Sequence, residues 1–270
     1  MKILFCGDIV GRAGRDVVIE HVPRLRDDLG LDFVVANGEN AAHGFGITGK
    51  ICSELYDAGV DVITTGNHIW DQREIIGHID GDRRLLRPVN YPRGTPGRGA
   101  EVYAVRGGAK VLVINVMCRL FMDPLDNPFE RLEAEMAKHR LGGSVAAIVV
   151  DVHGEATSEK QAFGHLLDGR ASLVVGSHTH VPTADERVLP GGTAFITDAG
   201  MCGAYDSVIG MVKEPILTRF VRKLPTERMS PASGPATLCG VYVETDDDSG
   251  LALRIGAVRI GGDLAPAMPA

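Results

Sequence analysis

The chain opens with Lys2-Ile3-Leu4-Phe5-Cys6-Gly7-Asp8, a short apolar run that ends in a glycine and a carboxylate. A run of this length, stopped by a turn residue, is typical of a buried β-strand. The same arrangement returns at residues 33–40 and 60–68, whose apolar runs end in Asn37-Gly38-Glu39-Asn40 and Thr65-Gly66-Asn67-His68. Short strands separated by helical segments are typical of an α/β protein, so this pattern decides the fold class.

Helical periodicity fills the intervals between these runs. Val18, Val22, Leu25 and Leu29 recur at helical spacing and predict a helix over residues 15–29. Further helices are expected over residues 48–58, 71–79, 128–140, 158–167 and 215–224. The fourth of these opens with Ser158-Glu159-Lys160-Gln161, which has the pattern of a capping box.

The remaining strands change in character along the chain. They are expected at residues 101–105, 110–116, 145–150, 172–175, 187–189, 193–197, 240–243 and 251–260. Arg106-Gly107-Gly108-Ala109 predicts a hairpin, and hairpins dominate after about residue 185. The expected architecture is therefore an α/β core whose sheet continues into antiparallel strands. Because no linker or composition break divides the chain, we expect residues 1–270 to form a single domain.

Composition limits the class of partner. The chain has 270 residues, of which 44% are hydrophobic and 23% charged, as in an ordinary globular protein. The formal net charge is −7, and no basic stripe is present, so a long nucleic acid is not an expected partner. A small phosphorylated substrate stays compatible with this charge, because a bound metal can be the largest local charge in a site.

The cysteines and the lengths of the apolar runs indicate where in the cell the protein is expected. The five cysteines, at 6, 52, 118, 202 and 239, form neither a disulfide framework nor a CxxC motif. The first apolar run is too short for a signal peptide, and no stretch reaches the roughly 18 apolar residues of a membrane span. We therefore expect a soluble cytoplasmic protein without a membrane partner, and association into a homo-oligomer stays open.

Polar side chains follow five of the predicted strands. These are Asp8, Glu39 with Asn40, Asn67 with His68, His153, and His178 with His180. In open α/β sheets, ligands bind just beyond the carboxyl ends of parallel strands, so these side chains are expected to meet in one region. Oxygen ligands together with several imidazoles suit Mn, Fe or Zn better than Mg or Ca. The sequence therefore predicts a transition-metal site.

Each of these residues also has an ordinary structural explanation when it is taken alone. Asp8 could cap a helix, Glu39 could be a surface acid, and Asn67 could be a turn residue. A lone histidine is more often structural than a ligand, whereas the spacing in His178-Thr179-His180 recurs in metal sites. The five clusters at successive strand ends favour a shared site over five separate explanations.

The order of these motifs is similar to that of the calcineurin-like metallophosphoesterases, and it resembles their YmdB-like branch more closely. The resemblance rests on Phe5-Cys6-Gly7-Asp8-Ile9-Val10-Gly11, Asn37-Gly38-Glu39-Asn40, residues 64–71, residues 151–160, residues 176–185 and Thr197-Asp198-Ala199-Gly200-Met201. It implies a layered sandwich of mixed β-sheets flanked by helices, with a dinuclear metal site at the C-terminal ends of the strands.

Two positions depart from the wider superfamily. Val10 stands where a histidine is usual, and Gly38-Glu39 stands where a Gly-Asp turn is usual. Both departures are features that the YmdB-like branch implies. Asn40 is placed to replace the missing imidazole as an oxygen ligand. An oxygen in place of a nitrogen makes the first site a harder ligand set, in the sense of hard and soft ligands.

The resemblance also implies a role for each residue. Asp8, Glu39, Asn40 and His180 would hold one metal ion; Glu39, Asn67, His153 and His178 would hold the second. Glu39 would bridge the two ions, which would be Fe or Mn foremost, with Zn also compatible. His68 would be the proton donor. The implied reaction is hydrolysis of small cyclic nucleotides, notably the 2′,3′-cyclic kind, by two-metal activation of water with a histidine general acid.

Two other interpretations stay open. An amidohydrolase also combines paired histidines with further ligands, although its His-x-His normally follows the first barrel strand. A regulator that binds nucleotide or metal without turnover is suggested by Gly11-Arg12-Ala13-Gly14 at the start of a helix. That run matches neither G-x-G-x-x-G nor a P-loop, so it is a weak signal.

Overall fold

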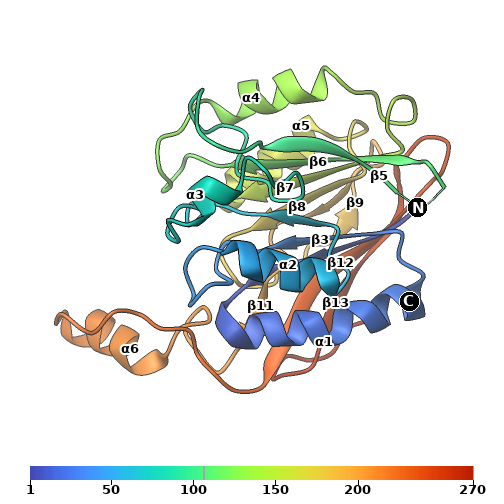
Figure 1. The fold of residues 1–270 in the computed structure, drawn as a ribbon. Helices are drawn as coiled ribbons and strands as arrows, with labels where there is room; N and C mark the ends of the chain where they lie inside the picture. The colour runs from blue at the N-terminus through green and yellow to red at the C-terminus, as the bar shows by residue number, and fades with distance from the viewer. Residues whose placement is uncertain (106, 270) are drawn as a thin grey trace.

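The computed structural model describes residues 1–105 and 107–269, whose strands form two mixed β-sheets packed against each other (Figure 1). The first sheet has the order β2-β11-β12-β1-β3-β4, and β13 also pairs with β12. Its strands are β1 (Lys2–Cys6), β2 (Asp8–Ile9), β3 (Phe33–Asn37), β4 (Val62–Thr64), β11 (Met201–Ala204), β12 (Ala236–Thr245) and β13 (Ala252–Ile260). Here β1, β3 and β4 run parallel, whereas β12 is antiparallel to β1, β11 and β13.

The second sheet has the order β5-β6-β7-β8-β10-β9. Its strands are β5 (Ala100–Ala104), β6 (Lys110–Met117), β7 (Ala147–His153), β8 (Leu173–Ser177), β9 (Arg187–Val188) and β10 (Ala194–Ile196). The four central strands, β6, β7, β8 and β10, run parallel, and the edge strands β5 and β9 are antiparallel to their neighbours. Because strands in the middle of a parallel sheet are buried on both faces, β6 and β7 are almost continuously apolar.

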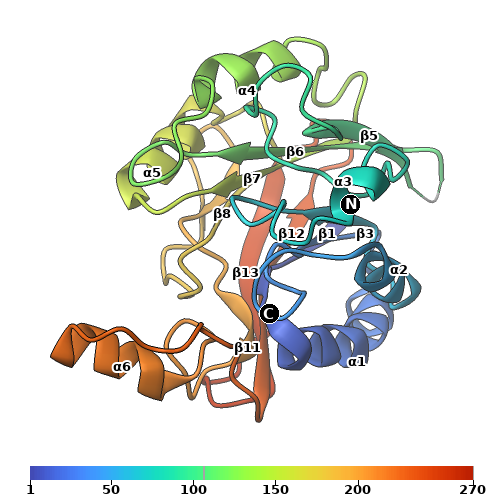
Figure 2. The ribbon, with the colours of Figure 1, turned by 60° about the vertical axis from the view of Figure 1, so that its left-hand side comes forward.

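The described residues form six helices, four of which cover the outer faces of the sheets (Figure 1). They are α1 (Gly11–Leu29), α2 (Gly49–Asp57), α3 (Ile75–His78), α4 (Pro128–Met136), α5 (Thr157–Leu166) and α6 (Lys213–Arg222). Figure 1 shows α1 and α2 against the first sheet and α4 and α5 against the second. In Figure 2, α6 projects away from both sheets. None of the helices in the described part of the chain has the length and apolar composition needed to cross a membrane.

The core follows from this layering. Phe5, Val35, Val113 and Val149 belong to the cluster between the two sheets, where each strand contributes alternate side chains. A second cluster fills the space between the first sheet and α1 and α2, and a third lies under α4 and α5. The predicted α/β class with mixed sheets flanked by helices is confirmed. The amidohydrolase alternative is wrong, because the strands form two layered sheets and not a closed barrel.

The prediction of a sheet that continues into antiparallel strands is confirmed for the first sheet, in which β12 is antiparallel to both β1 and β13. The late strand β12 pairs with β1, from Lys2↔Glu244 to Cys6↔Gly240, and so returns to the middle of the first sheet. Only β9 and β10 extend the second sheet. An apolar strand pattern predicts that a segment joins a β-sheet but not which strand it pairs with. The pairing depends on how the whole core packs.

Two local predictions differ from the structure, and a third agrees with it. Helix α1 begins at Gly11, four residues early, because the buried Gly11 and Gly14 contribute no apolar side chain to the periodicity. The capping box is wrong: α5 begins at Thr157 without a side-chain cap, and Glu159 instead accepts hydrogen bonds from the loop after β6. The predicted hairpin is present as the antiparallel pair β5–β6, although Arg106 lies outside the described residues.

Candidate metal centre

The seven predicted ligands lie at the carboxyl ends of strands from both sheets. Asp8 follows β1, Glu39 and Asn40 follow β3, and Asn67 follows β4, all in the first sheet. His153 is the last residue of β7, and His178 and His180 follow β8 in the second sheet. The two sheets therefore supply different halves of one site, which is why no single sequence motif contains it.

The first group of converging atoms is centred on His153. Its Nε2 lies 3.2 Å from Oε1 of Glu39, 3.1 Å from Oδ1 of Asn67 and 3.1 Å from Nδ1 of His178. Its other ring nitrogen, Nδ1, lies 2.9 Å from Oγ of Ser177, which fixes the ring orientation. One nitrogen cannot make three good hydrogen bonds at once, so this convergence is typical of ligands around a cation.

The second group joins Asp8, Glu39 and His180 and therefore shares Glu39 with the first. The amide of Asn40 completes it, with Nδ2 3.1 Å from both Oε1 of Glu39 and Nε2 of His180. Within the described residues, Oδ1 of Asn40 is buried without a hydrogen-bond partner. Such an orphaned oxygen is costly unless a cation uses it, and a flip of the amide would turn it toward the site.

Burial and mutual charge shift the pKa values of this cluster. Burial raises the pKa of Asp8 well above its ordinary value, although His153 lowers it. Burial would also raise the pKa of Glu39, but the charge and hydrogen bond of His153 outweigh it and leave that pKa below its usual range. Burial lowers the pKa of His153, whereas Glu39 raises it to about 9. Burial, and then the charge of His153, lower the pKa of His178 to about 3.

The pKa of His180 is also lowered, by burial first. Neutral imidazoles at His178 and His180 keep a free lone pair, which is the form that binds metals. The cluster thus combines carboxyl and amide oxygens with imidazole nitrogens in a buried space. That donor set fits a pair of transition-metal cations.

The backbone that carries the paired histidines is strained. His178 and His180 have φ values of 96° and 64°, in a region that side-chain-bearing residues rarely adopt. Asp198 holds the loop, because its Oδ2 accepts from the backbone N of Thr179 at 3.1 Å and from the Thr179 hydroxyl at 2.7 Å. Lys160 Nζ lies 2.8 Å from the same oxygen, in a fully buried ion pair.

Sequence reasoning did not give Lys160 or Asp198 a role. Both lie within the quoted motifs, but nothing in a sequence shows that a lysine is buried. The structure also adds Glu155, whose Oε2 lies 3.4 Å from Nε2 of His178. Lys160 and Asp198 support the loop that carries the paired histidines, and Glu155 contacts His178 directly. Such supporting contacts are visible only in the folded chain.

His68 lies beside the cluster and faces a hollow of about 350 Å³ that Glu39, His178 and His180 also line. Its Nδ1 is 2.9 Å from Oδ2 of Asp71, the acidic neighbour three residues on. Its backbone N donates to Oε2 of Glu39 at 3.3 Å, which ties it to the cluster. The ring is therefore oriented by a carboxylate and close to the predicted ligands.

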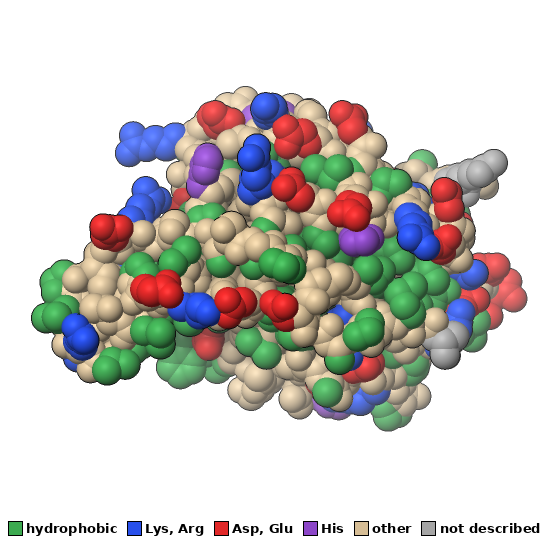
Figure 3. All heavy atoms as spheres, turned by 90° about the horizontal axis from the view of Figure 1, so that it is seen from below, with side chains coloured by type: hydrophobic (Ala, Val, Ile, Leu, Met, Phe, Trp, Pro, Cys, Tyr) green, Lys and Arg blue, Asp and Glu red, His purple; other side chains and the backbone are tan. Residues whose placement is uncertain are grey.

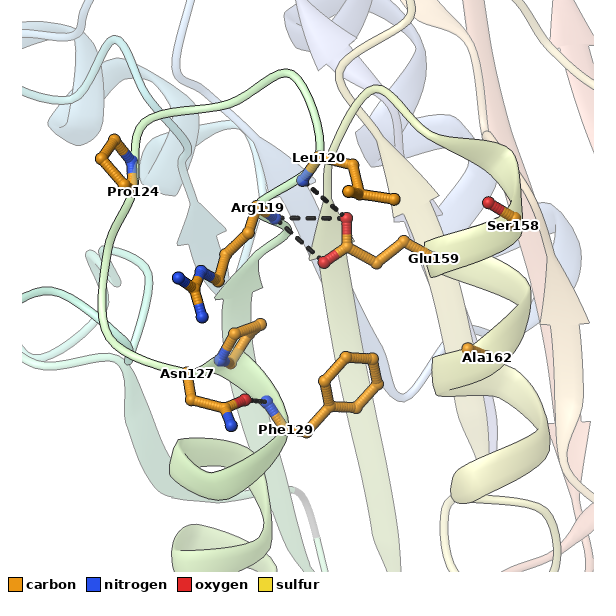
Figure 4. Close-up of a pocket in the computed structure, with 9 residues that line it drawn as sticks. Arg119, Leu120, Pro124, Asn127, Phe129, Ser158, Glu159 and Ala162 are labelled. Atoms are coloured by element: carbon orange, nitrogen blue, oxygen red, sulfur yellow. Dashed lines mark hydrogen bonds between the residues drawn. The ribbon is translucent and has the colours of Figure 1, made fainter.

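Other cavities and clusters lie elsewhere. A larger hollow of about 620 Å³ is bounded by α4, α5 and the loop after β6, where Glu159 accepts from the amides of Arg119 and Leu120 at 3.0 Å each (Figure 4). None of the seven predicted ligands lines it. Cys52, His78 and Asp82 also come together, but they share no residue with the site. Size and proximity alone therefore do not identify the functional centre.

The chain is similar to known proteins over nearly its whole length. The family model described as YmdB-like protein matches residues 4–258. The chain is 49% identical over 266 residues to a protein of Bacillus subtilis (strain 168) named 2′,3′-cyclic-nucleotide 2′-phosphodiesterase, covering 97% of this chain and 98% of that protein. It is 34% identical over 270 residues to a putative phosphatase/phosphodiesterase of Mycoplasma pneumoniae, covering 97% of this chain and 94% of the relative.

The chain is also similar to solved structures over nearly its whole length. A hypothetical protein from Thermus thermophilus has a TM-score of 0.90 and 41% identity, covering 97% of this chain and 100% of that chain. A structure described as a novel phosphatase from Mycoplasma pneumoniae also has a TM-score of 0.90, with 34% identity and coverage of 97% and 94%. At these identities and coverages the likeness extends over the whole fold described above.

Proposed function

Because the chain belongs to the YmdB-like family, we propose that it is a metallophosphoesterase that hydrolyses the phosphodiester bond of small cyclic nucleotides, those with a 2′,3′-cyclic phosphate foremost. The name of the Bacillus subtilis relative supports the substrate class. One observation carries the proposal: side chains from five strand ends meet in two groups that share Glu39.

The cluster would hold two transition-metal ions. Asp8, Glu39, Asn40 and His180 would surround one ion, and Glu39, Asn67, His153 and His178 the other. The unpaired Oδ1 of Asn40 and the mixed nitrogen and oxygen donors support this assignment, with Fe or Mn foremost and Zn also compatible. When bound, the ions would neutralise charge on the phosphodiester and activate a water molecule.

The chain's own residues would position the substrate and move the proton. Asp71 would accept a hydrogen bond from Nδ1 of His68, and in the doubly protonated ring Nε2 would carry the proton to be transferred. His68 would then give a proton to the oxygen that leaves phosphorus, and such general acid catalysis typically contributes ~10²–10⁴-fold. The side chains of Phe45 and Met211 give the same hollow an apolar wall that limits access of water.

The proposal includes the cellular compartment in which the enzyme acts. All five cysteines are free and buried, which is compatible with a reducing cytoplasm. We place the enzyme there, with a small phosphodiester as its partner. A non-catalytic regulator has no specific observation in its favour, whereas His68, oriented by Asp71 beside the candidate ligands, favours catalysis.

The proposed function is tested by comparing substrates after reconstitution with Mn or Fe. Bis-p-nitrophenyl phosphate and 2′,3′-cyclic AMP are diesters, whereas p-nitrophenyl phosphate is a monoester. Higher kcat/KM for the diesters is expected, because among the described residues no cluster of cationic side chains lines the hollow to hold a dianionic phosphate. A preference for the monoester would contradict the proposal.

A further inference from the structure

The hollow at the metal centre adjoins a second hollow on one side. The first has a volume of about 350 Å³ and contains His178 and His180, and the second has about 480 Å³ and contains Arg228. Phe45 and Met229 line both hollows. A molecule with one end at the metal centre can therefore extend across the Phe45 ring into the second space.

The walls of the second hollow are preformed. On one side, the backbone N of Phe45 donates to the carbonyl of Ala42 at 3.0 Å, and the amide of Gln72 donates to the carbonyl of Phe45 at 2.8 Å. On the other side, the backbone N of Val212 donates to the carbonyl of Ser230 at 3.0 Å. Because both segments are anchored, binding there needs little ordering of the chain.

The chemistry of this space is that of a stacking site. The half-buried ring of Phe45 stands edge-on to His68, with 5.1 Å between the ring centroids. The guanidinium of Arg228 lies 5.8 Å from the Phe45 ring centroid, and within the described residues it makes no ion pair. Aromatic rings and guanidinium planes are the groups on which unpaired nucleobases stack.

We propose that this second hollow is the base subsite: the nucleobase of the cyclic nucleotide stacks on Phe45 while the phosphate lies at the metal centre. The guanidinium of Arg228, which lies 5.8 Å from the Phe45 ring centroid, moves outward to cover the other face of the base. The inference rests on the proposed function and adds the group that the enzyme recognises. It assigns to Phe45 and Arg228 a binding role that the metal chemistry does not require.

The subsite has a defined selectivity. Gln72, the amide side chain in its wall, already donates to the backbone carbonyl of Phe45 and is not free to read a base edge, so stacking on Phe45 makes the main contribution to recognition. Stacking is tolerant of base identity because every base has a π-face, and its strength rises with ring area. The 2′,3′-cyclic purine nucleotides are thus bound better than the pyrimidine ones, with adenine and guanine nearly alike.

The test compares 2′,3′-cyclic AMP with glycerol 1,2-cyclic phosphate, a cyclic diester without a base. In the Mn-reconstituted wild-type protein, kcat/KM is higher for the nucleotide. Phe45→Leu keeps an apolar wall but removes the ring, and Arg228→Ala removes the cover. Each lowers the ratio of the two kcat/KM values by roughly 10-fold, mainly through KM for the nucleotide.

Matched controls come from α6, which projects away from the site and whose hydrophobic side chains gather at one end of the molecule (Figure 3). Phe220→Leu and Arg222→Ala remove an exposed ring and an exposed charge outside both hollows, and they leave the ratio unchanged. Equal losses on both substrates in Phe45→Leu would overturn the subsite, as would a wild-type ratio near one.

A binding measurement separates the subsite from the proposed function. Adenosine is added to the wild-type protein, and saturation-transfer NMR is recorded on its base and ribose protons. Transfer strongest at the base protons, lost in Phe45→Leu and retained in Phe220→Leu, supports the subsite even if no turnover is found. Absence of transfer in the wild type, or its survival in Phe45→Leu, overturns the subsite whatever the enzyme hydrolyses.

Discussion

Glu39 is the residue on which both halves of the site depend. It belongs to both converging groups, and its two carboxylate oxygens face different partners, His153 and the backbone of His68. Glu39→Gln keeps the shape but removes the charge, so it should weaken binding of both metal ions. His178→Ala should weaken one. Metal content after dialysis against increasing chelator measures this, and loss of a single ion in both variants would remove the bridging role.

His68 is expected to act on a proton and not on a metal. Its ring is held by Asp71 and lies beside the groups that would bind metal. His68→Ala should therefore lower turnover of 2′,3′-cyclic AMP by ~10²–10⁴-fold while metal content stays at the wild-type level. The loss should shrink for bis-p-nitrophenyl phosphate, because p-nitrophenolate leaves without protonation. Equal losses on both substrates, or an emptied metal site, would show that the assignment is wrong.

At the residue scale, the structure brings the predicted ligand residues together, whereas nothing in the sequence indicated the residues that support them. Asp8, Glu39 and Asn67 could be found because each follows a recognisable apolar run and a glycine-containing turn. Lys160 and Asp198 could not, because their pairing joins a helix to a loop that follows a different strand. Long-range pairings of this kind depend on the packing of the whole chain.

At the scale of elements, the loop after β8 depends on α5. Lys160 neutralises Asp198, which in turn holds Thr179 between the two left-handed histidines. Lys160→Met should leave Asp198 buried and unpaired, which typically costs about 3–5 kcal/mol in the free energy of unfolding. Urea unfolding of the metal-free protein measures this cost.

The matched control for Lys160 is an exposed pair of similar geometry. Arg170 contacts Glu133 through two hydrogen bonds of 2.7 and 2.8 Å, and both side chains are accessible to solvent. Arg170→Met should cost about 1 kcal/mol or less, because water replaces the lost partner. Equal costs for the two variants would mean that burial does not make the Lys160 pair important.

The elements themselves were predictable to different degrees. The apolar runs that begin β3 and β7 and make up most of β1 were clear, because strands buried on both faces have few polar interruptions. The short β11 was not predicted, since its residues Met201–Ala204 show neither alternation nor length. The start of α1 was missed because glycine, which favours close packing, is a poor helix former by propensity.

At the scale of the whole molecule, we propose that residues 1–270 form one domain. The first strand pairs with β12 near the end of the chain, and a single apolar cluster joins both sheets. The metal-free protein should therefore unfold in one transition. Far-UV circular dichroism and the fluorescence of Trp70, the only tryptophan, should give the same midpoint in urea. Two separated midpoints would indicate independently folding parts.

The central claim is that the protein binds two metal ions at the strand ends and uses them to hydrolyse a phosphodiester. Its most direct test is turnover of 2′,3′-cyclic AMP by the metal-free chain as Mn or Fe is added in measured equivalents. Activity should rise and reach its plateau at about two ions per chain, as a two-metal mechanism requires. Metal binding without turnover at any ratio would instead indicate a regulator, and a plateau at one ion would contradict the dinuclear site.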